Sequence, residues 1–232
     1  MIDIHSHILP NIDDGPDSIE KTEKILLLFQ QFGYKKIIPS PHYYPSIFEK
    51  CDKEIKESIR EISKLDNGYL INDYTREYYI DFVFLKKIRD GEFIKTFPDG
   101  KHILIEFSFG IPPTNWESII FEIESAGYKT ILAHPERYFW LKDLKTFIKD
   151  YKTRGGMLQA NLGSFDNLYG SFAKKIVKKM IKEDLLDFIA TDTHSVEQLK
   201  FLGTKTLPKI IKKYGNNKIM KLMKDNPSQL LG

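Results

Sequence analysis

Short apolar runs alternate along this chain with longer stretches whose apolar residues recur at helical spacing. The apolar runs predict strands at residues 2–5, 36–40, 69–71 continuing to 77–79, 102–108, 129–134, 157–161 and 186–191. The helical spacing predicts helices at residues 18–32, 47–65, 81–89, 115–126, 143–154 and 171–184, and two short helices from residue 204 to the end with Asn226-Pro227 between them. Strands and helices therefore alternate about seven times along the chain.

Such alternation is typical of a parallel sheet covered by helices, which is an α/β fold. A closed barrel fits better than an open sheet, because candidate polar residues stand at the C-terminal end of nearly every predicted strand. A barrel gathers those ends around one mouth. Barrels of this class often form single domains of about this length, so we expect residues 1–232 to be one domain.

Composition narrows the partners and the compartment. The 35 basic and 32 acidic residues leave a net charge of +3, which does not argue for nucleic acid and mildly favours an anionic substrate. Cys51 is the only cysteine, so we expect no internal disulfide and a reducing cytoplasm. Only four residues precede His5, so no signal peptide is expected there. The chain has no run of eighteen apolar residues, so we expect no membrane span.

The first stretch, MIDIHSHILPNIDDG, concentrates the candidate chemistry. Apolar and polar residues alternate over residues 2–5, as in a strand. His5 and His7 are two positions apart, so both imidazoles leave the same face and can share one ion. Asp13 and Asp14 follow in a turn and add carboxylates, which are hard oxygen ligands for a divalent cation. A histidine-rich strand beside a solvated pair of aspartates is the alternative interpretation.

Nitrogen and oxygen donors gather at one rim of the predicted barrel. Of the six histidines only His102 begins a strand, on the opposite rim, and Asp192 and His194 repeat the spacing of the first histidine pair. Taken singly, each donor is as easily a loop cap or a solvated strand end. Nine donors on one rim instead predict a multinuclear metal site, for which imidazole and carboxylate ligands suit manganese, iron or zinc. The nine are His5, His7, Asp14, His42, Glu77, Glu106, His134, Asp192 and His194, with Asp13 as the alternative to Asp14.

These motifs identify a family. The sequence resembles the PHP (polymerase and histidinol phosphatase) superfamily and, within it, the bacterial tyrosine phosphatases encoded with capsular and exopolysaccharide machinery. The matching stretches are DIHSHILPNIDDGP at 3–16, PSPHYYP at 39–45, EYY at 77–79, LIEFS at 104–108, LAHPERY at 132–138 and TDTH at 191–194. They span nearly the whole chain in the right order.

The resemblance implies a distorted seven-stranded (β/α) barrel with two or three divalent transition-metal ions, most readily manganese. It assigns one ion to His5, His7, Glu77 and Asp192, a second to Glu77, Glu106 and His134, and a third to Asp14, His42 and His194. Arg137, in the PERY motif, matches the family's phosphate-binding arginine and is the expected catalytic residue. A surface arginine in a loop is its alternative.

Two departures from the family pattern stand out. The pair before Glu77 is usually small, whereas here it is Thr75-Arg76. Some members also carry a second arginine shortly after the last histidine, and residues 195–200 contain none. Lys200 could replace it as a point charge, but it cannot clamp phosphate in a bidentate way.

The expected activity is hydrolysis of phosphotyrosine in proteins by a metal-bridged hydroxide that attacks phosphorus in line. The resemblance implies that the substrate is the tail of a cognate tyrosine kinase that controls polysaccharide assembly. A histidinol-phosphate or other small-molecule phosphatase would use the same metal site. A metal-dependent amidohydrolase would want a bridging lysine where Glu77 stands, and a metal-binding scaffold without turnover is the non-enzymatic alternative. A cysteine-based tyrosine phosphatase is excluded, because the residue six positions after Cys51 is Glu57 and not arginine.

Overall fold

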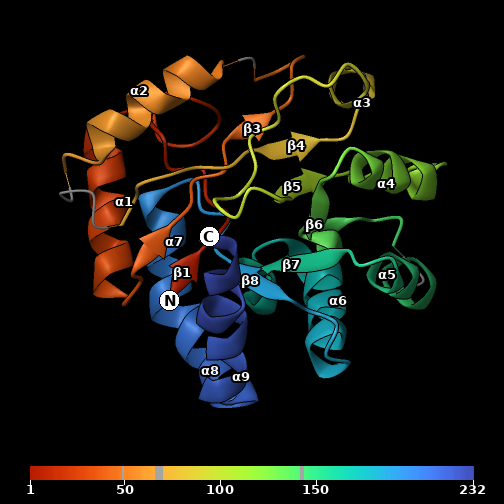
Figure 1. Ribbon diagram of the computed structural model, residues 1–232. Coiled ribbons are helices and arrows are strands. Elements are labelled where there is room, and N and C mark those ends of the chain that lie inside the picture. Colours follow the sequence, from red (N-terminus) through yellow and green to blue (C-terminus); the bar gives the residue numbers. More distant parts are fainter. Residues whose placement is uncertain (49, 66–69, 142–143) are drawn as a thin grey trace.

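The computed structural model describes residues 1–48, 50–65, 70–141 and 144–232, and Figure 1 shows its helices arranged around the strands. The strands are β1 (Ile2–Asp3), β2 (Lys36–Ile37), β3 (His42–Tyr43), β4 (Glu77–Tyr79), β5 (His102–Glu106), β6 (Lys129–Ala133), β7 (Met157–Asn161) and β8 (Phe188–Ala190). The α-helices are α1 (Ile19–Gln31), α2 (Asp52–Ile62), α3 (Phe82–Arg89), α4 (Trp116–Ser125), α5 (Leu144–Thr153), α6 (Gly170–Lys182), α7 (Val196–Phe201), α8 (Leu207–Tyr214) and α9 (Asn216–Met220). Short 3-10 turns cover Pro135–Arg137, Leu162–Asp166 and Pro227–Leu230, and π-helical turns cover Leu202–Thr206 and Lys221–Asp225.

All the strand pairs are parallel, which confirms the predicted α/β class. Strands β3 to β8 form one six-stranded sheet in sequence order, and β1 pairs with β2 separately. The sheet therefore has six strands where the sequence predicts a barrel of seven. Pro39 and Pro41 have no N–H to donate and separate β2 from β3.

Backbone hydrogen bonds nevertheless place the β1–β2 pair between the two edges of the larger sheet. Within the pair, Ser40 N donates to Ser6 O at 2.9 Å, and on one side of it Thr75 N donates to Pro39 O at 2.9 Å. On the other side, Asp192 N donates to the carbonyl oxygen of His5 at 2.8 Å. Extended segments from both ends of the chain therefore lie side by side.

Several predicted element ends are confirmed. The Ser18 hydroxyl caps α1 by accepting from Lys21 N at 3.4 Å, and Gly33 follows the helix with φ +82°. Asp81 caps α3 by accepting from Phe84 N at 2.8 Å. These ends follow local hydrogen-bonding chemistry, which a sequence exposes directly.

Other predictions are wrong. The helix predicted at 47–65 begins only at Asp52, because residues 44–48 form a turn in which Ile47 N donates to Tyr44 O. Leu70 and Ile71 lie outside any strand, and helix α7 was not predicted. An additional break at Gly215, with φ +87°, was not predicted, whereas the predicted break at Asn226-Pro227 is present between Lys221–Asp225 and Pro227–Leu230. The predictions for residues 69 and 143 fall outside the described part of the chain.

The strands bury apolar residues on both faces. On β5, Ile103 and Ile105 join the larger apolar cluster, whereas Leu104 joins a smaller one. Glu106 follows Leu104 on the same face, because alternate strand residues share a face. The alternation that buries Leu104 thus brings Glu106 to the rim of the smaller cluster. That cluster consists of Ile2, Ile4, Ile38, Phe97, Leu104, Ile131, Ala133, Phe188, Ala190 and Leu230.

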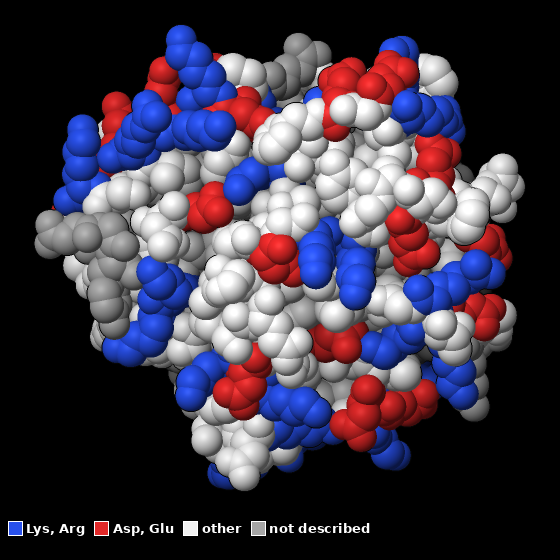
Figure 2. Space-filling model, viewed as in Figure 1, with Lys and Arg blue, Asp and Glu red and all other residues white. Residues whose placement is uncertain are grey.

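On the face seen in Figure 2, acidic and basic side chains are interspersed, and no large area carries charges of a single sign. None of the helices in the described ranges has the length and apolar character that a bilayer crossing requires.

Candidate active site

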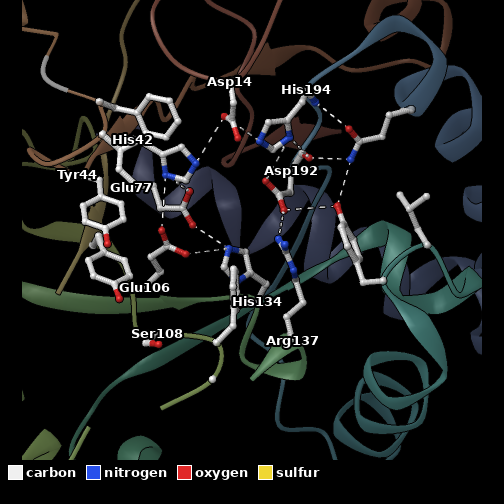
Figure 3. A pocket seen from close by; sticks show the side chains of 18 residues that line it. Asp14, His42, Tyr44, Glu77, Glu106, Ser108, His134, Arg137, Asp192 and His194 are labelled. Atoms are coloured by element: carbon white, nitrogen blue, oxygen red, sulfur yellow. Dashed lines mark hydrogen bonds and ion pairs between the residues drawn. The ribbon is translucent and has the colours of Figure 1, made fainter. Parts of the chain in front are cut away.

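A cavity of about 750 Å³ opens at the rim where the predicted donors gather (Figure 3). His5 and His7 are buried, with 0% and 1% of their surface exposed, and contact the other donors from the interior. His102 lies apart, at the start of β5, as expected. The structure thus brings all nine predicted donors into one cluster. The seven that line the cavity are Asp14, His42, Glu77, Glu106, His134, Asp192 and His194.

Glu77 stands at the centre of this cluster. Its Oε2 atom lies 3.2 Å from a ring nitrogen of each of three histidines, His5, His7 and His42. Its other oxygen, Oε1, lies 2.8 Å from Nε2 of His134. Figure 3 shows Glu77 converging with His42, His134 and Glu106. A single carboxylate therefore contacts imidazoles from three strand ends and the first loop.

Four overlapping groups of donors have the spacing that a metal ion requires. In each group the ligand atoms lie within 4.8 Å of one another. Glu77 belongs to two of them, which suits a carboxylate that bridges two ions. The groups are His7, Asp14, His42 and His194; His5, Glu77 and His134; His5, His7 and Asp192; and His42, Glu77 and Glu106.

The first two histidines are held in the form that binds metal. His5 Nδ1 donates to Gln159 Oε1 at 2.8 Å, and His7 Nδ1 donates to Asp13 Oδ2 at 2.7 Å. The remaining nitrogens, Nε2 of each ring, lie 3.2 Å apart, and each lies 3.2 Å from Glu77 Oε2. Two ring nitrogens at that distance repel unless a proton or a metal cation is shared there, and a metal ion can take the place of the proton. The donor set therefore fits a divalent ion.

The electrostatics of the cavity also favour a cation. Burial lowers the pKa of His5, but the carboxylates of Glu77 and Asp192 more than offset this, so the pKa is raised overall. Burial and the Glu77 carboxylate raise the pKa of Glu106 well above its usual range. Burial is also the main reason that the pKa of His134 falls to about 4, which keeps its ring neutral. The protein alone thus leaves the Glu106 carboxylate short of positive charge.

The two aspartates of the first loop take different places. Asp14 is half-exposed, and its Oδ1 lies 3.3 Å from Nε2 of His194 and 3.7 Å from Nε2 of His42. Asp13 is bound from behind the cluster, accepting from the His7 ring and from His42 N at 3.1 Å. Burial opposes ionisation of Asp13, but His7 and His42 lower its pKa to about 2. Asp14 therefore faces the cavity, while Asp13 orients His7.

Two of the donors sit on strained backbone. His134 has φ +33° and Asp192 has φ +49°, both in the left-handed region. Non-glycine residues held there cost about 1–3 kcal/mol and cluster at functional sites. At His134 the twist interrupts the alternation of β6, in which Ile131 and Ala133 belong to the smaller cluster, and turns the imidazole into the cavity.

Arg137 lies at the edge of the cluster. Its Nη1 donates to Oδ2 of Asp192 at 3.0 Å, which Figure 3 shows. The guanidinium carbon lies 4.5 Å from the ring centre of Phe109 and 4.4 Å from that of Tyr169. Stacking on two rings fixes the plane of the guanidinium and leaves it facing the cavity. The alternative of an unattached surface arginine is inconsistent with these contacts.

Sequence reasoning missed the residues that hold the donors in place. Gln159 and Asn161 lie on β7, where Gln159 Nε2 donates to Asn161 Oδ1 at 2.9 Å and Asn161 Nδ2 donates to Asp192 Oδ2. The sequence feature that could have identified them is a pair of amide side chains at alternate positions of a buried strand. Gln198 donates to the carbonyl of Asp192 at 2.8 Å and accepts from His194 N. Nothing in its helical sequence context marked it.

Lys200 and Cys51 lie outside the cavity. Lys200 is exposed on α7, and Gln198 lines the cavity in its place. Cys51 is exposed and stands at the N-terminus of α2 rather than within the helix. Neither residue contacts the donor cluster.

The whole chain resembles known proteins. The family model for capsular polysaccharide synthesis, CpsB/CapC, matches residues 1–232. The tyrosine-protein phosphatase CpsB of Streptococcus pneumoniae is 30% identical over 239 residues, covering 100% of this chain and 98% of that protein. The tyrosine-protein phosphatase YwqE of Bacillus subtilis is 26% identical over 219 residues, covering 93% and 86%. A crystal structure from work on YwqE and CpsB, described as unique metal-dependent tyrosine phosphatases, superposes with a TM-score of 0.86 at 25% identity, covering 100% of this chain and 94% of that one.

Proposed function

The chain belongs to the CpsB/CapC family of capsular polysaccharide synthesis, and we propose on that basis that it is a metal-dependent protein-tyrosine phosphatase. The observation that carries the proposal is the pair of imidazole Nε2 atoms 3.2 Å apart, surrounded by buried carboxylates. Such an arrangement fits metal ions, and Arg137 beside it supplies a group that binds phosphate.

We assign the nine donors to three ions as the family resemblance implies. His5, His7 and Asp192 would hold one ion, with Glu77 bridging to the next. Manganese is the proposed ion, because a mixed imidazole and carboxylate set without thiolate suits it, and iron or zinc would also be accepted. The full assignment is His5, His7, Glu77 and Asp192; Glu77, Glu106 and His134; and Asp14, His42 and His194. The four overlapping groups of donors support it.

Bound divalent ions would make water a nucleophile at neutral pH and neutralise phosphoryl oxygens. Arg137 would bind the remaining phosphoryl oxygens through its planar fork, and would stabilise the charge that develops as the ester bond breaks. Phe109 and Tyr169 hold the guanidinium plane for this contact. Asp192 can contact a metal ion and Arg137 at the same time, because its Oδ1 faces His5 and His7 while its Oδ2 accepts a hydrogen bond from Arg137.

The walls of the cavity suit an aryl phosphate. Tyr44 and Tyr79 stack at 4.1 Å on one side, and Phe48 and Phe109 also line the cavity. These rings offer apolar contact to a phosphotyrosine ring whose phosphate reaches the donors. We propose that the protein substrate is a tyrosine kinase of polysaccharide assembly, consistent with the family's role.

We further propose that the strands close into the distorted seven-stranded barrel of the family, with β2 and β3 counted as one interrupted strand. The hydrogen bonds from Ser40 to Ser6 and from Asp192 to His5 support closure. A barrel explains why donors from the first and last strands share one cavity. On this basis residues 1–232 would be a single catalytic domain.

The experiment that tests the function measures metal content and phosphatase activity on the same preparation. We expect retained manganese, iron or zinc and hydrolysis of phosphotyrosine peptides in preference to phosphoserine peptides. Histidinol phosphate, assayed side by side, tests the small-molecule alternative. Metal without hydrolysis of any phosphomonoester would point to the scaffold instead.

A further inference from the structure

A second cavity, of about 360 Å³, lies against the opposite face of the β3–β4 pair. Neighbouring residues of a strand face opposite ways. His42 and Glu77 belong to the donor cluster, whereas Tyr43 and Tyr78, the next residues along, line the second cavity. Phe48 lines both cavities and stacks on the His42 ring at 5.1 Å. The two cavities therefore adjoin at Phe48.

Arg76 contributes a buried charge to the second cavity. Only 3% of its side chain is exposed, and Nη1 and Nη2 both donate to a single acceptor, the carbonyl oxygen of Lys50, at 3.0 and 2.7 Å. Among the described residues, the one carboxylate within 4 Å is that of Asp52, at 3.7 Å, beyond hydrogen-bonding distance. A guanidinium has five N–H donors. Arg76 therefore keeps donors that no protein anion satisfies, in a wall of the cavity.

Two of the other three charged residues that line the cavity are also positive. Lys50 and Lys87 line it with Arg76, against one acidic residue, Asp52. Each lysine pairs with a glutamate outside the lining, Glu54 at 2.9 Å and Glu92 at 2.8 Å. These glutamate side chains are 42% and 54% exposed, and such exposed pairs contribute only about 0–1 kcal/mol. An incoming anion can therefore replace them.

We propose that the second cavity binds an oxyanion-bearing side chain of the protein substrate, a carboxylate or a phosphate close in sequence to the phosphotyrosine. The proposal rests on the proposed phosphatase function and specifies its substrate further. Arg76 and the two lysines supply the charge complementarity. The rings of Tyr43, Tyr78 and Phe93 leave the cavity walls apolar enough to accept an aryl phosphate as well as a carboxylate. A single extended segment can pass over Phe48 and reach both cavities.

The experiment compares kcat/KM for phosphotyrosine peptides with Glu or Gln at successive positions around the phosphotyrosine. Glu at the favoured position should raise kcat/KM about tenfold over Gln, equivalent to about 1.4 kcal/mol. A second phosphotyrosine placed there separates the two sources of the oxyanion. A further gain identifies phosphate as the preferred group, and no further gain identifies carboxylate.

Two variants locate the preference in the cavity. Arg76→Met and Lys87→Met should each lower the Glu-to-Gln ratio toward one. If a substitution only displaced a loop, kcat/KM for the Glu and Gln peptides would fall together and their ratio would stay unchanged. Lys86→Met is the matched control, because Lys86 lies on the same helix, pairs with Asp90 and is absent from the lining. Since Arg76 also binds the Lys50 carbonyl, Lys87→Met decides the matter if Arg76→Met does not fold.

A ratio near one at every position in the wild type overturns the proposal, as does a ratio that survives Lys87→Met. Free phosphotyrosine is the reference substrate that separates this proposal from the function itself. If it is not hydrolysed, the phosphatase function fails. In that case fluorescence anisotropy measures the Kd values of the Glu and Gln peptides, and their ratio tests whether the second cavity binds the oxyanion.

Discussion

Gln159 and Asp192 are joined through one intervening side chain, that of Asn161, and together they orient both ends of a proposed metal site. Gln159 accepts from Nδ1 of His5 at 2.8 Å and donates to Asn161, whose amide in turn donates to Asp192. The two amides lie on β7, a strand that contributes no proposed ligand itself. The orientation of His5 and Asp192 thus depends on a third element of the fold.

We expect Gln159→Leu to weaken metal binding about 10–100-fold, because partners that orient a ligand commonly contribute that much to affinity. Titration of manganese into metal-free protein measures the change. Gln159→Glu keeps an acceptor for His5 and should recover part of the affinity. Gln31→Leu, on the exposed face of α1, is the control. An unchanged affinity in Gln159→Leu would remove the amide from the metal site.

Arg137→Ala should keep its metals and lose most of its activity. One charge-assisted contact to the transferring phosphoryl group is worth ~3 kcal/mol, or about a hundredfold in rate. Arg137→Lys should recover only part, because an ammonium lacks the planar fork. Steady-state kinetics with metal analysis of each variant, and inhibition by inorganic phosphate, measure the effect. If the alanine variant keeps its full metal content and the wild-type rate, the phosphate is bound by the metal ions alone and not by Arg137.

Removal of the metal should abolish activity and lower the Tm. A ligand present at a hundred times its Kd stabilises the folded state by about 2.7 kcal/mol. For a chain of this length, each kcal/mol shifts the Tm by roughly 2–4 °C. Differential scanning calorimetry before and after chelation, then after manganese is restored, checks both effects. Full activity in a metal-free preparation would contradict the proposed function.

Glu136 should make the stability of the metal-free protein depend on pH. Burial raises its pKa to about 7, against hydrogen bonds from Ser164 and Asn161, whereas the ordinary value is 4.5. The folded state therefore holds this proton to higher pH than the unfolded state, so the contribution of Glu136 to stability falls as pH rises from about 4.5 to about 7. A shift of that size corresponds to roughly 3 kcal/mol.

Glu136→Gln cannot ionise, so its stability relative to the wild type should increase across that pH range. Urea unfolding of both metal-free proteins at several pH values measures the difference. Glu23→Gln, at an exposed position of α1, controls for the loss of a charge. A difference between Glu136→Gln and wild type that stays constant with pH would show that folding does not raise the pKa of Glu136.

The sequence was informative wherever a local rule governs the structure. The strand predicted at 102–108 placed Glu106 near its end, where β5 ends, and the spacing of His5 and His7 placed both rings on one side. The caps Ser18 and Asp81 follow from hydrogen bonds to residues three positions ahead. Such features depend on neighbours in the chain, so single-sequence reasoning reaches them.

Single-sequence reasoning did not predict the features that depend on packing between distant parts of the chain. Whether Asp13 or Asp14 faces the cavity depends on His7, because the His7 ring hydrogen-bonds to Asp13. The break at Gly215, and the start of α2 at Asp52, depend on how the helices meet the rest of the fold. Arg76 was visible only as a departure from the family pattern, since its cavity is built from separate elements.

The backbone contact between His5 and Asp192 has a consequence for how the protein matures. These residues come from the first and last strands, so the contact closes a loop that contains most of the chain, and such long-range closure is slow compared with local folding. A chain still being synthesised carries most of the donors long before TDTH at 191–194 appears, yet Asp192 and His194 are missing until then. High-affinity uptake of metal should therefore wait until residues 191–194 have been made, and chains terminated before them should remain metal-poor and accessible to proteases.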